Sequence, residues 1–172
     1  MKIGILSDTH KKVDYSRQVI DHLLNEGVEF FIHAGDIGEE DVLMQLRNSG
    51  VRYVAVYGNN DSHLAEVHNH YNLVQEPHYF KLAHTKFKLM HLPFYMSADT
   101  EIVIFGHTHT FECDFKKGTL FLNPGEVCAR SKPISECAML EITDENFNVT
   151  HYTRPLKKTK FKAQHFSFER ES

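Results

Sequence analysis

The chain has 172 residues, of which 41% are apolar and 24% charged, and its formal net charge is −4 with neutral histidines. This composition is typical of one globular domain with its own core, and the charge argues against nucleic-acid binding driven by bulk electrostatics. No apolar run approaches the roughly 18 residues of a membrane helix, and the N-terminal run is too short for a signal peptide, so we expect a cytoplasmic protein without membrane contact.

The first part of the chain alternates between strand-like and helix-like patterns. Apolar runs predict buried strands at residues 3–7, 30–34 and 51–57, helical spacing predicts helices at 15–24 and 40–46, and residues 62–69 predict a short helix. This β-α-β-α-β order indicates parallel strands joined by right-handed crossovers.

After about residue 71 the pattern changes to strands that follow one another closely. We expect strands at residues 79–82, 87–91, 102–105, 111–115, 119–122, 137–142 and 147–152. About ten strands are too many for one comfortable open sheet. The predicted fold class is therefore α/β, a four-layer α/β/β/α sandwich of two packed mixed β-sheets flanked by helices.

Residues 1–155 would form this single domain, and residues 156–172 would form a C-terminal tail. The tail is charged but carries Phe161, Phe166 and Phe168. It is either a partly disordered end or a segment whose aromatic side chains dock on this or a neighbouring subunit.

The number and spacing of the cysteines and histidines limit their roles. Cys113, Cys128 and Cys137 are odd in number and show no CxxC spacing, which fits reduced thiols better than a disulfide framework. We interpret them as small buried residues. The 13 histidines are spread along the chain instead of forming a tract, so each is judged by its position.

Side chains that can bind metals follow five of the predicted strands. In open α/β sheets, ligands bind outside the carboxyl ends of the strands, so these side chains would face one cleft. They are Asp8, His10, Asp36, Asn59, His91, His107 and His109. One transition-metal ion binds about four to six ligands, so seven are too many for a single ion. They suit two ions about 3.5–4 Å apart. Nitrogen and oxygen donors favour manganese, iron, zinc, cobalt or nickel, with Asp36 as the expected bridge.

Each of these residues also has an ordinary structural interpretation. Asp8 and Asp36 could cap the helices that follow them, Asn59 could be a turn residue, and each histidine could lie in the core or on the surface. Their joint occurrence at five strand ends favours the metal site. Asp61 is expected to orient a histidine or the loop rather than to bind metal.

The same residues resemble the motif blocks of the calcineurin-like metallophosphoesterases. The blocks D-x-H, G-D, G-N-x-D/E, H and G-H-x-H correspond in order to Asp8-Thr9-His10, Gly35-Asp36, Gly58-Asn59-Asn60-Asp61, His91 and Gly106-His107-Thr108-His109, and Asn123-Pro124-Gly125 resembles a further short motif. Length and the opening Ser7-Asp8-Thr9-His10 are most similar to the compact YfcE-type phosphodiesterases. The resemblance assigns Asp8, His10 and His109 to a first metal, Asn59, His91 and His107 to a second, and Asp36 to both.

The resemblance implies a metal-dependent phosphoesterase, with a phosphodiesterase as the leading prediction. A hydroxide bridging two divalent ions, preferably manganese, would attack phosphorus in line. Many relatives have a histidine at Asn60, which can contact substrate but cannot supply a proton near neutral pH. His63 is the candidate substitute acid, and Arg130 is a candidate substrate contact. Relatives often continue Gly-His after His91, so the Leu-Pro here lacks a substrate-facing histidine.

Two other functions stay open. A phosphomonoester or phosphoprotein phosphatase needs extra positive donors, usually arginines, and only Arg130 follows a loop expected at the site, residues 123–129. A protein-interaction scaffold, resembling the retromer subunit on this fold, has degraded metal chemistry, whereas all seven positions here hold competent ligands. We expect a small phosphoester substrate, no nucleic-acid or membrane partner, and treat a homodimer through the aromatic tail as an open prediction.

Overall fold

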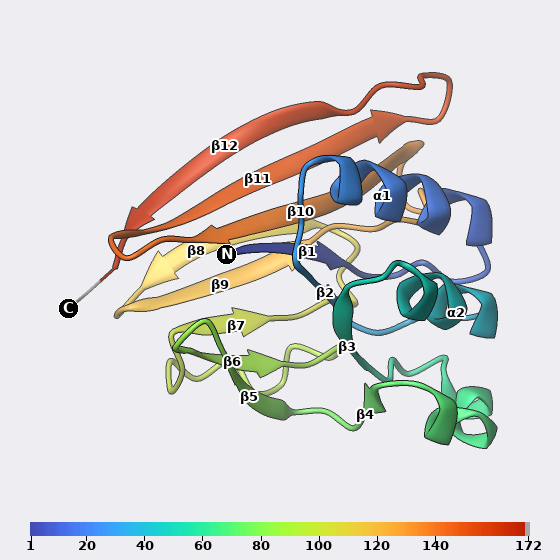
Figure 1. Cartoon of the computed structure of the whole chain (residues 1–172), viewed down its shortest axis with the longest axis horizontal. Helices are drawn as coiled ribbons and strands as arrows, with labels where there is room; N and C mark the ends of the chain where they lie inside the picture. The colour runs from blue at the N-terminus through green and yellow to red at the C-terminus, as the bar shows by residue number, and fades with distance from the viewer. Residues whose placement is uncertain (171–172) are drawn as a thin grey trace.

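The computed structural model describes residues 1–170 and arranges them in two β-sheets packed face to face (Figure 1). The larger sheet contains β1 (Lys2–Leu6), β2 (Phe30–His33), β3 (Arg52–Val56), β4 (Leu73–Val74), β10 (Ile134–Ile142), β11 (Asn146–Pro155) and β12 (Lys162–Glu169). The smaller sheet contains β5 (His78–Leu82), β6 (Thr85–Leu89), β7 (Ile102–Ile104), β8 (Phe111–Lys116) and β9 (Thr119–Pro124). The strand orders are β12-β11-β10-β1-β2-β3-β4 and β5-β6-β7-β9-β8.

Both sheets mix parallel and antiparallel neighbours. Strands β1 to β4 run parallel, as the alternating pattern predicted, and β10, β11 and β12 extend the sheet antiparallel from β1. In the smaller sheet β6, β7 and β9 are parallel, with antiparallel strands at both edges. The predicted fold of two packed mixed sheets is confirmed.

The helices cover the outer face of the larger sheet. Helices α1 (Val13–Asn25) and α2 (Glu40–Asn48) are the two parallel crossovers, and Leu23 of α1 packs with Phe31 of β2 in an apolar cluster on this face. The predicted helix at residues 62–69 is two 3₁₀ segments, η1 (Ser62–Glu66) and η2 (His68–His70).

The outer face of the smaller sheet differs from the predicted helical layer. In the described part of the chain this face is covered by the connection from β6 to β7, which Lys88 holds by donating from Nζ to the carbonyl oxygens of Tyr95 and Ser97 at 2.9 and 3.0 Å. This connection, residues 90–101, carries Pro93, which disfavours a helix. The helical flank therefore exists on one side of the sandwich.

The main core lies between the sheets. Ile5 and Ile32 of the larger sheet share one buried cluster with Leu89 and Ile104 of the smaller sheet. Burying one such side chain stabilises the fold by about 1.5–3 kcal/mol. This core fixes the two sheets against each other, so the loops at their strand ends have defined relative positions.

The tail packs on its own chain. Strand β12 pairs antiparallel with β11, and Phe166 and Phe168 join the inter-sheet core, with ring centroids 5.5 Å from Phe111 and 5.6 Å from Phe115. Phe161 stacks on the ring of His22 at 4.2 Å. The aromatic side chains that suggested a dimer are therefore used within the chain, and residues 171–172 of the tail lie outside the described residues.

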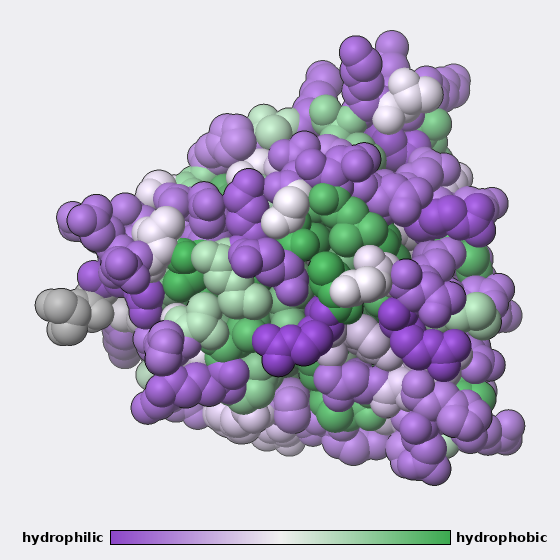
Figure 2. All heavy atoms as spheres, viewed as in Figure 1, coloured by the Kyte–Doolittle hydropathy of each residue, from purple (hydrophilic) through white to green (hydrophobic). Residues whose placement is uncertain are grey.

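Apolar side chains reach the surface in several places (Figure 2). Figure 2 shows a face on which hydrophilic side chains surround separate apolar patches. Within residues 1–170, none of the helices has the length and apolar character to cross a membrane.

Candidate metal centre

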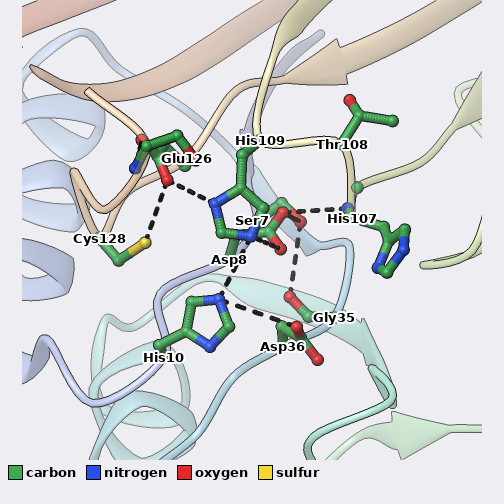
Figure 3. A network of polar contacts seen from close by, with 12 residues as sticks. Ser7, Asp8, His10, Gly35, Asp36, His107, Thr108, His109, Glu126 and Cys128 are labelled. Atoms are coloured by element: carbon green, nitrogen blue, oxygen red, sulfur yellow. Dashed lines mark hydrogen bonds and ion pairs between the residues drawn. The ribbon is translucent and has the colours of Figure 1, made fainter.

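The predicted ligands lie in loops that follow strands of both sheets. Asp8 and His10 follow β1, Asp36 follows β2 and Asn59 follows β3, while His91 follows β6 and His107 and His109 follow β7. Figure 3 shows the side chains of Asp8, His10, Asp36 and His109 pointing toward one another. The structure thus brings together side chains that are about a hundred residues apart in the sequence.

The first predicted set forms a compact group. His109 Nε2 lies 3.4 Å from His10 Nε2 and 3.2 Å from Asp8 Oδ1. Asp8 is fully buried, whereas the side chains of His10 and His109 are 17% and 15% exposed. The carboxylate therefore forms the base of the group and the two imidazoles its wall.

The second predicted set is grouped in the same way. His91 Nε2 lies 3.0 Å from Asn59 Oδ1, and the ring of His107 meets the ring of His91 edge to face at 5.1 Å. His91 is buried, while Asn59 and His107 are exposed. This group is therefore open to solvent on the side of Asn59 and His107.

Asp36 lies between the two sets. Its Oδ2 is 3.8 Å from Nε2 of His10 and 3.5 Å from Nε2 of His91. One carboxylate oxygen thus has an imidazole of each set beside it. This is the position that a bridging ligand requires.

The backbone at the predicted ligands is unusual. Nine non-glycine residues of the described chain have positive φ, and five of them are predicted ligands. These five are Asp8 (53°), His10 (45°), Asp36 (52°), His107 (69°) and His109 (58°). Left-handed conformations of non-glycine residues cost about 1–3 kcal/mol each and cluster at functional sites. The fold holds these side chains in strained positions, which Asp and His adopt more readily than most other non-glycine residues.

Two glycines allow the loops to approach closely. A Cβ on Gly35, whose φ is +85°, would lie 2.6 Å from Cβ of His91. A Cβ on Gly58 would lie 2.2 Å from Oδ1 of Asp36. Any larger residue would displace predicted ligands, which explains why glycine precedes Asp36 and Asn59.

Hydrogen bonds orient two of the imidazoles so that Nε2 faces the centre. His91 Nδ1 donates to the carbonyl oxygen of Ala34 at 2.8 Å, and His109 Nδ1 donates to the carboxylate of Glu126. Metal-binding histidines usually donate their other ring N–H to a carbonyl or carboxylate in this manner. Both rings are therefore held in the orientation that presents Nε2 to a cation.

The pKa values of two imidazoles are raised at the positions that a cation would take. The ion pair with Asp8, the contact with Cys128 and the hydrogen bond with Glu126 outweigh burial and raise the pKa of His109 to about 11. Burial by itself would lower the pKa of His91, but the hydrogen bond with Asp36 and nearby carboxylate charges raise it. Each Nε2 proton thus lies against a carboxylate, where a divalent ion would replace it.

The carboxylates are held ionised. Burial would raise the pKa of Asp36, but the hydrogen bond and charge of His91 and donation from Asn60 hold it well below its usual range. Burial would likewise raise the pKa of Asp8, but His109 and Ser7 lower it. Both aspartates are therefore charged at neutral pH.

One buried oxygen tests whether these residues fit a metal. Asp8 Oδ2 accepts hydrogen bonds from Ser7 Oγ at 2.7 Å and from the His107 amide at 3.1 Å. Asp8 Oδ1 is fully buried and has no partner with hydrogen-bond geometry among the described residues, although His109 Nε2 is near. A buried carboxylate oxygen is unfavourable unless a cation lies beside it, which is the charged His109 ring here and would be a metal ion once the ring is deprotonated. The donor set therefore fits metal ions.

Asp61 and His33 support the loops. The Asp61 carboxylate accepts backbone N–H groups of Ile37, Gly38 and Gly58 at 2.8–2.9 Å, which join the loops after β2 and β3. His33 Nδ1 accepts the Gly35 N–H at 3.2 Å, which leaves Nε2–H to donate to Thr9 at 2.9 Å. His33 is thus an ordinary core histidine.

The sequence analysis gave no role to Glu126 and interpreted Cys128 as a small buried thiol, and the structure confirms that Cys128 is a free, buried cysteine. Glu126 is buried and accepts hydrogen bonds from His109, from Cys128 Sγ at 3.3 Å and from the amides of Ser131 and Lys132 at 2.8 and 3.1 Å. Both residues follow β9, a sixth strand that ends at this group of side chains. Residues 123–129 were expected at the site, but nothing in the sequence distinguishes the Glu126 side chain from an ordinary loop glutamate.

The remaining candidates are nearby but make different contacts. The backbone N–H of Asn60 donates to Asp36 Oδ1 at 3.0 Å, and its side-chain Nδ2 donates to Asp36 Oδ2 at 2.8 Å. Asn60 therefore orients Asp36. His63 Nε2 donates to the Gly38 carbonyl at 3.1 Å. Arg130 is exposed. Burial is the main cause of the lowered pKa of His10, and the nearby charge of Arg130 lowers that pKa further.

Comparison with known proteins identifies the family of the chain. The calcineurin-like phosphoesterase superfamily domain matches residues 1–145. Phosphodiesterase MJ0936 of Methanocaldococcus jannaschii is 29% identical over 160 residues, covering 86% of this chain and 96% of the relative.

Two solved structures share the fold. The phosphoesterase YfcE from E. coli superposes with a TM-score of 0.72 at 19% identity, covering 95% of this chain and 98% of that one. A mutant of Vps29 from Entamoeba histolytica gives a TM-score of 0.74 at 22% identity, covering 98% and 99%. The predicted resemblance to small phosphodiesterases and the predicted enzyme class, a phosphoester hydrolase, are confirmed. The chain belongs to the calcineurin-like phosphoesterase superfamily.

Proposed function

We propose that the chain is a phosphodiesterase that uses two divalent metal ions. The observation that supports this best is the position of Asp36, whose Oδ2 lies between His10 and His91 at 3.8 and 3.5 Å. A single carboxylate shared by two groups of nitrogen and oxygen donors is typical of two-metal phosphoester hydrolases. Asp8, His10 and His109 would hold the first ion and Asn59, His91 and His107 the second.

The ions would supply a bridging hydroxide near neutral pH and neutralise charge on the phosphoryl group, with manganese preferred and iron, zinc, nickel or cobalt as alternatives. The protein residues determine the approach of the substrate. Asn59 and His107 are exposed while Asp8 and His91 are buried, so the phosphate enters from the side of the exposed residues. Arg130 would pair with a phosphoryl oxygen on the side of His10.

The small number of cationic side chains favours a diester over a monoester. A monoester dianion requires more positive donors than a diester monoanion, and Arg130 is the one arginine proposed to contact it. The 29% identity with a protein named as a phosphodiesterase supports the same choice. A phosphomonoesterase or phosphoprotein phosphatase is thus the weaker candidate.

Protonation of the leaving group is the step for which this site offers the fewest suitable side chains. Asn60 is engaged with Asp36 and has no titratable proton near neutral pH. His63 stays the candidate acid, although it would have to release the Gly38 carbonyl to reach a substrate. Loss of activity on alkyl diesters, but not on aryl diesters, in a His63→Ala variant would support this role.

A protein-interaction scaffold is the second candidate function, because Vps29 proteins share the fold at TM-scores of 0.74 and 0.79. The complete set of metal-binding side chains favours the enzyme over the scaffold. A homodimer and a cytoplasmic location stay predictions, to be checked by light scattering and by fractionation.

The test compares metal-free and metal-loaded protein on a chromogenic diester and the matching monoester. We expect chelation to abolish hydrolysis, manganese to restore it, and the diester to react faster. An Asp36→Ala variant should lose more activity than a variant of any other ligand, whereas the exposed control Asp144→Ala should behave as the wild type. Full activity in the metal-free protein would refute the proposal.

A further inference from the structure

The loop that follows β9 carries a thiol to the first group of predicted ligands. The amides of Val127 and Cys128 donate to the carbonyl oxygens of Ser7 and Asp8, each at 3.1 Å. Ala129 then has a left-handed backbone with φ of 54°. These contacts hold Cys128 beside the Asp8 loop instead of in an apolar core.

The sulfur of Cys128 is within metal-binding range of two imidazoles. One ligand atom each from His10, His109 and Cys128 lie within 4.8 Å of one another. The residue is 3% exposed, and its Sγ has a hydrogen bond to Glu126 at 3.3 Å. Figure 3 shows Cys128 beside Glu126, with His109 and His10 nearby.

The other two cysteines have apolar surroundings. Cys113 packs against the inter-sheet core, and Cys137 is fully buried in the cluster beneath the helices. They belong to none of the groups of potential metal-binding side chains in the described residues. Cys128 is thus set apart by its position, not by its residue type.

We propose that Cys128 is an additional ligand of the first metal ion and makes that position selective for thiophilic ions. On binding, the Sγ–H bond breaks, the proton passes to solvent and the sulfur electron pair binds the ion. Thiolates favour zinc and related ions over manganese, while nitrogen and oxygen donors accept manganese more readily. The preference for manganese would then hold for the position near Asn59, His91 and His107, which has no thiol, while manganese at the first position would bind more weakly than zinc.

This inference rests on the proposed two-metal site but concerns only one of its positions. The competing explanation is that the thiol fills space and donates a hydrogen bond to Glu126. The two explanations differ in one observable property, because only a coordinated sulfur contributes to the spectrum of a bound transition metal.

The test is the electronic absorption spectrum of the cobalt-loaded protein. The wild type and the control Cys113→Ser should show a thiolate-to-cobalt charge-transfer band in the near ultraviolet, and Cys128→Ser should lose this band while still binding cobalt. The preference of the first position for zinc over manganese should fall at least about tenfold in Cys128→Ser. If Cys128→Ser does not fold, persistence of the band in Cys113→Ser and in Cys137→Ala assigns it to Cys128 by elimination.

Two results would overturn the inference: a cobalt-loaded wild type without the band, or a band that persists in Cys128→Ser. Diester hydrolysis measured on the same samples separates this failure from failure of the proposed function. Active cobalt protein without the band contradicts only the role of Cys128. Inactive cobalt protein with the band contradicts only the proposed activity.

Discussion

The hydrogen bond from His109 to Glu126 allows a sharp test of how the centre is assembled. In Glu126→Gln, Oε1 can still accept the amides of Ser131 and Lys132, but an NH₂ group replaces Oε2 beside His109 Nδ1. The imidazole must then accept at Nδ1 and carry its proton on Nε2, the atom proposed to bind the first ion. The fold should survive while the ring is held in the wrong tautomer.

The magnitude follows from the role of the hydrogen bond. Loss of a group that orients a metal-binding histidine lowers metal affinity by about 10–100-fold, or about 1.4–2.7 kcal/mol. Glu126→Ala should behave differently, because it leaves the Ser131 and Lys132 amides without a partner. At about 0.5–1.5 kcal/mol for each hydrogen bond lost by these partly exposed residues, the free energy of unfolding should fall by about 1–3 kcal/mol.

The assay combines chelator competition, which gives the dissociation constant of the metal, with urea unfolding of the metal-free protein. Glu126→Gln should change mainly the dissociation constant of the metal, and Glu126→Ala should change both this constant and the free energy of unfolding. The exposed control Glu66→Gln should change neither of the two. Wild-type metal affinity in Glu126→Gln would refute the argument that Glu126 sets the tautomer of His109.

Three further predictions concern protons and loop support. Metal binding at pH 7 should release at least about one proton per chain, because His109 has a pKa of about 11 without metal, and calorimetry in buffers of different ionisation enthalpy measures this. Burial lowers the pKa of His33 to about 4, so the unfolded chain binds the extra proton below pH 6.5. Stability should therefore fall by about 3 kcal/mol from pH 6.5 to 4, and a His33→Asn variant should lose this contribution in acid titrations followed by circular dichroism. Asp61→Ala should lower the free energy of urea unfolding by at least about 3 kcal/mol, because three amides lose their acceptor, and Asp61→Asn should lose less.

The sequence predicts the strands because their signal is local. Apolar runs such as residues 30–34 and 102–105 indicate buried strands wherever they pair. Strand β12 was not predicted, although Phe166 and Phe168 alternate with polar residues as a strand requires. That pattern is short, and its pairing with β11 depends on the inter-sheet core that receives the two rings. The aromatic side chains alone could not distinguish docking on this chain from docking on another.

The predicted ligands of the candidate site could be found from the sequence, but the backbone conformation and the hydrogen bonds that hold them could not. Ligand-type side chains after strands are visible in the sequence, and the parallel order indicates that they meet. The left-handed backbone at Asp36 and His107 is not visible, because it is imposed by contacts between distant loops. Glu126 was missed for a related reason, since a single glutamate after a turn carries no signal until the structure places it against His109.

The division of the site between two sheets explains why its geometry depends on the whole fold. Asp8 and His10 come from the larger sheet and His109 from the smaller, and Asp36 is joined to the smaller sheet through His91. Any loosening of the inter-sheet core would separate these donors by more than the tolerance of a metal–ligand bond. Conversely, ions bound between the loops would hold the two sheets together and stabilise the strained residues. Metal binding and sheet packing therefore stabilise the same arrangement, and the core between the sheets is as much a part of the centre as its ligands.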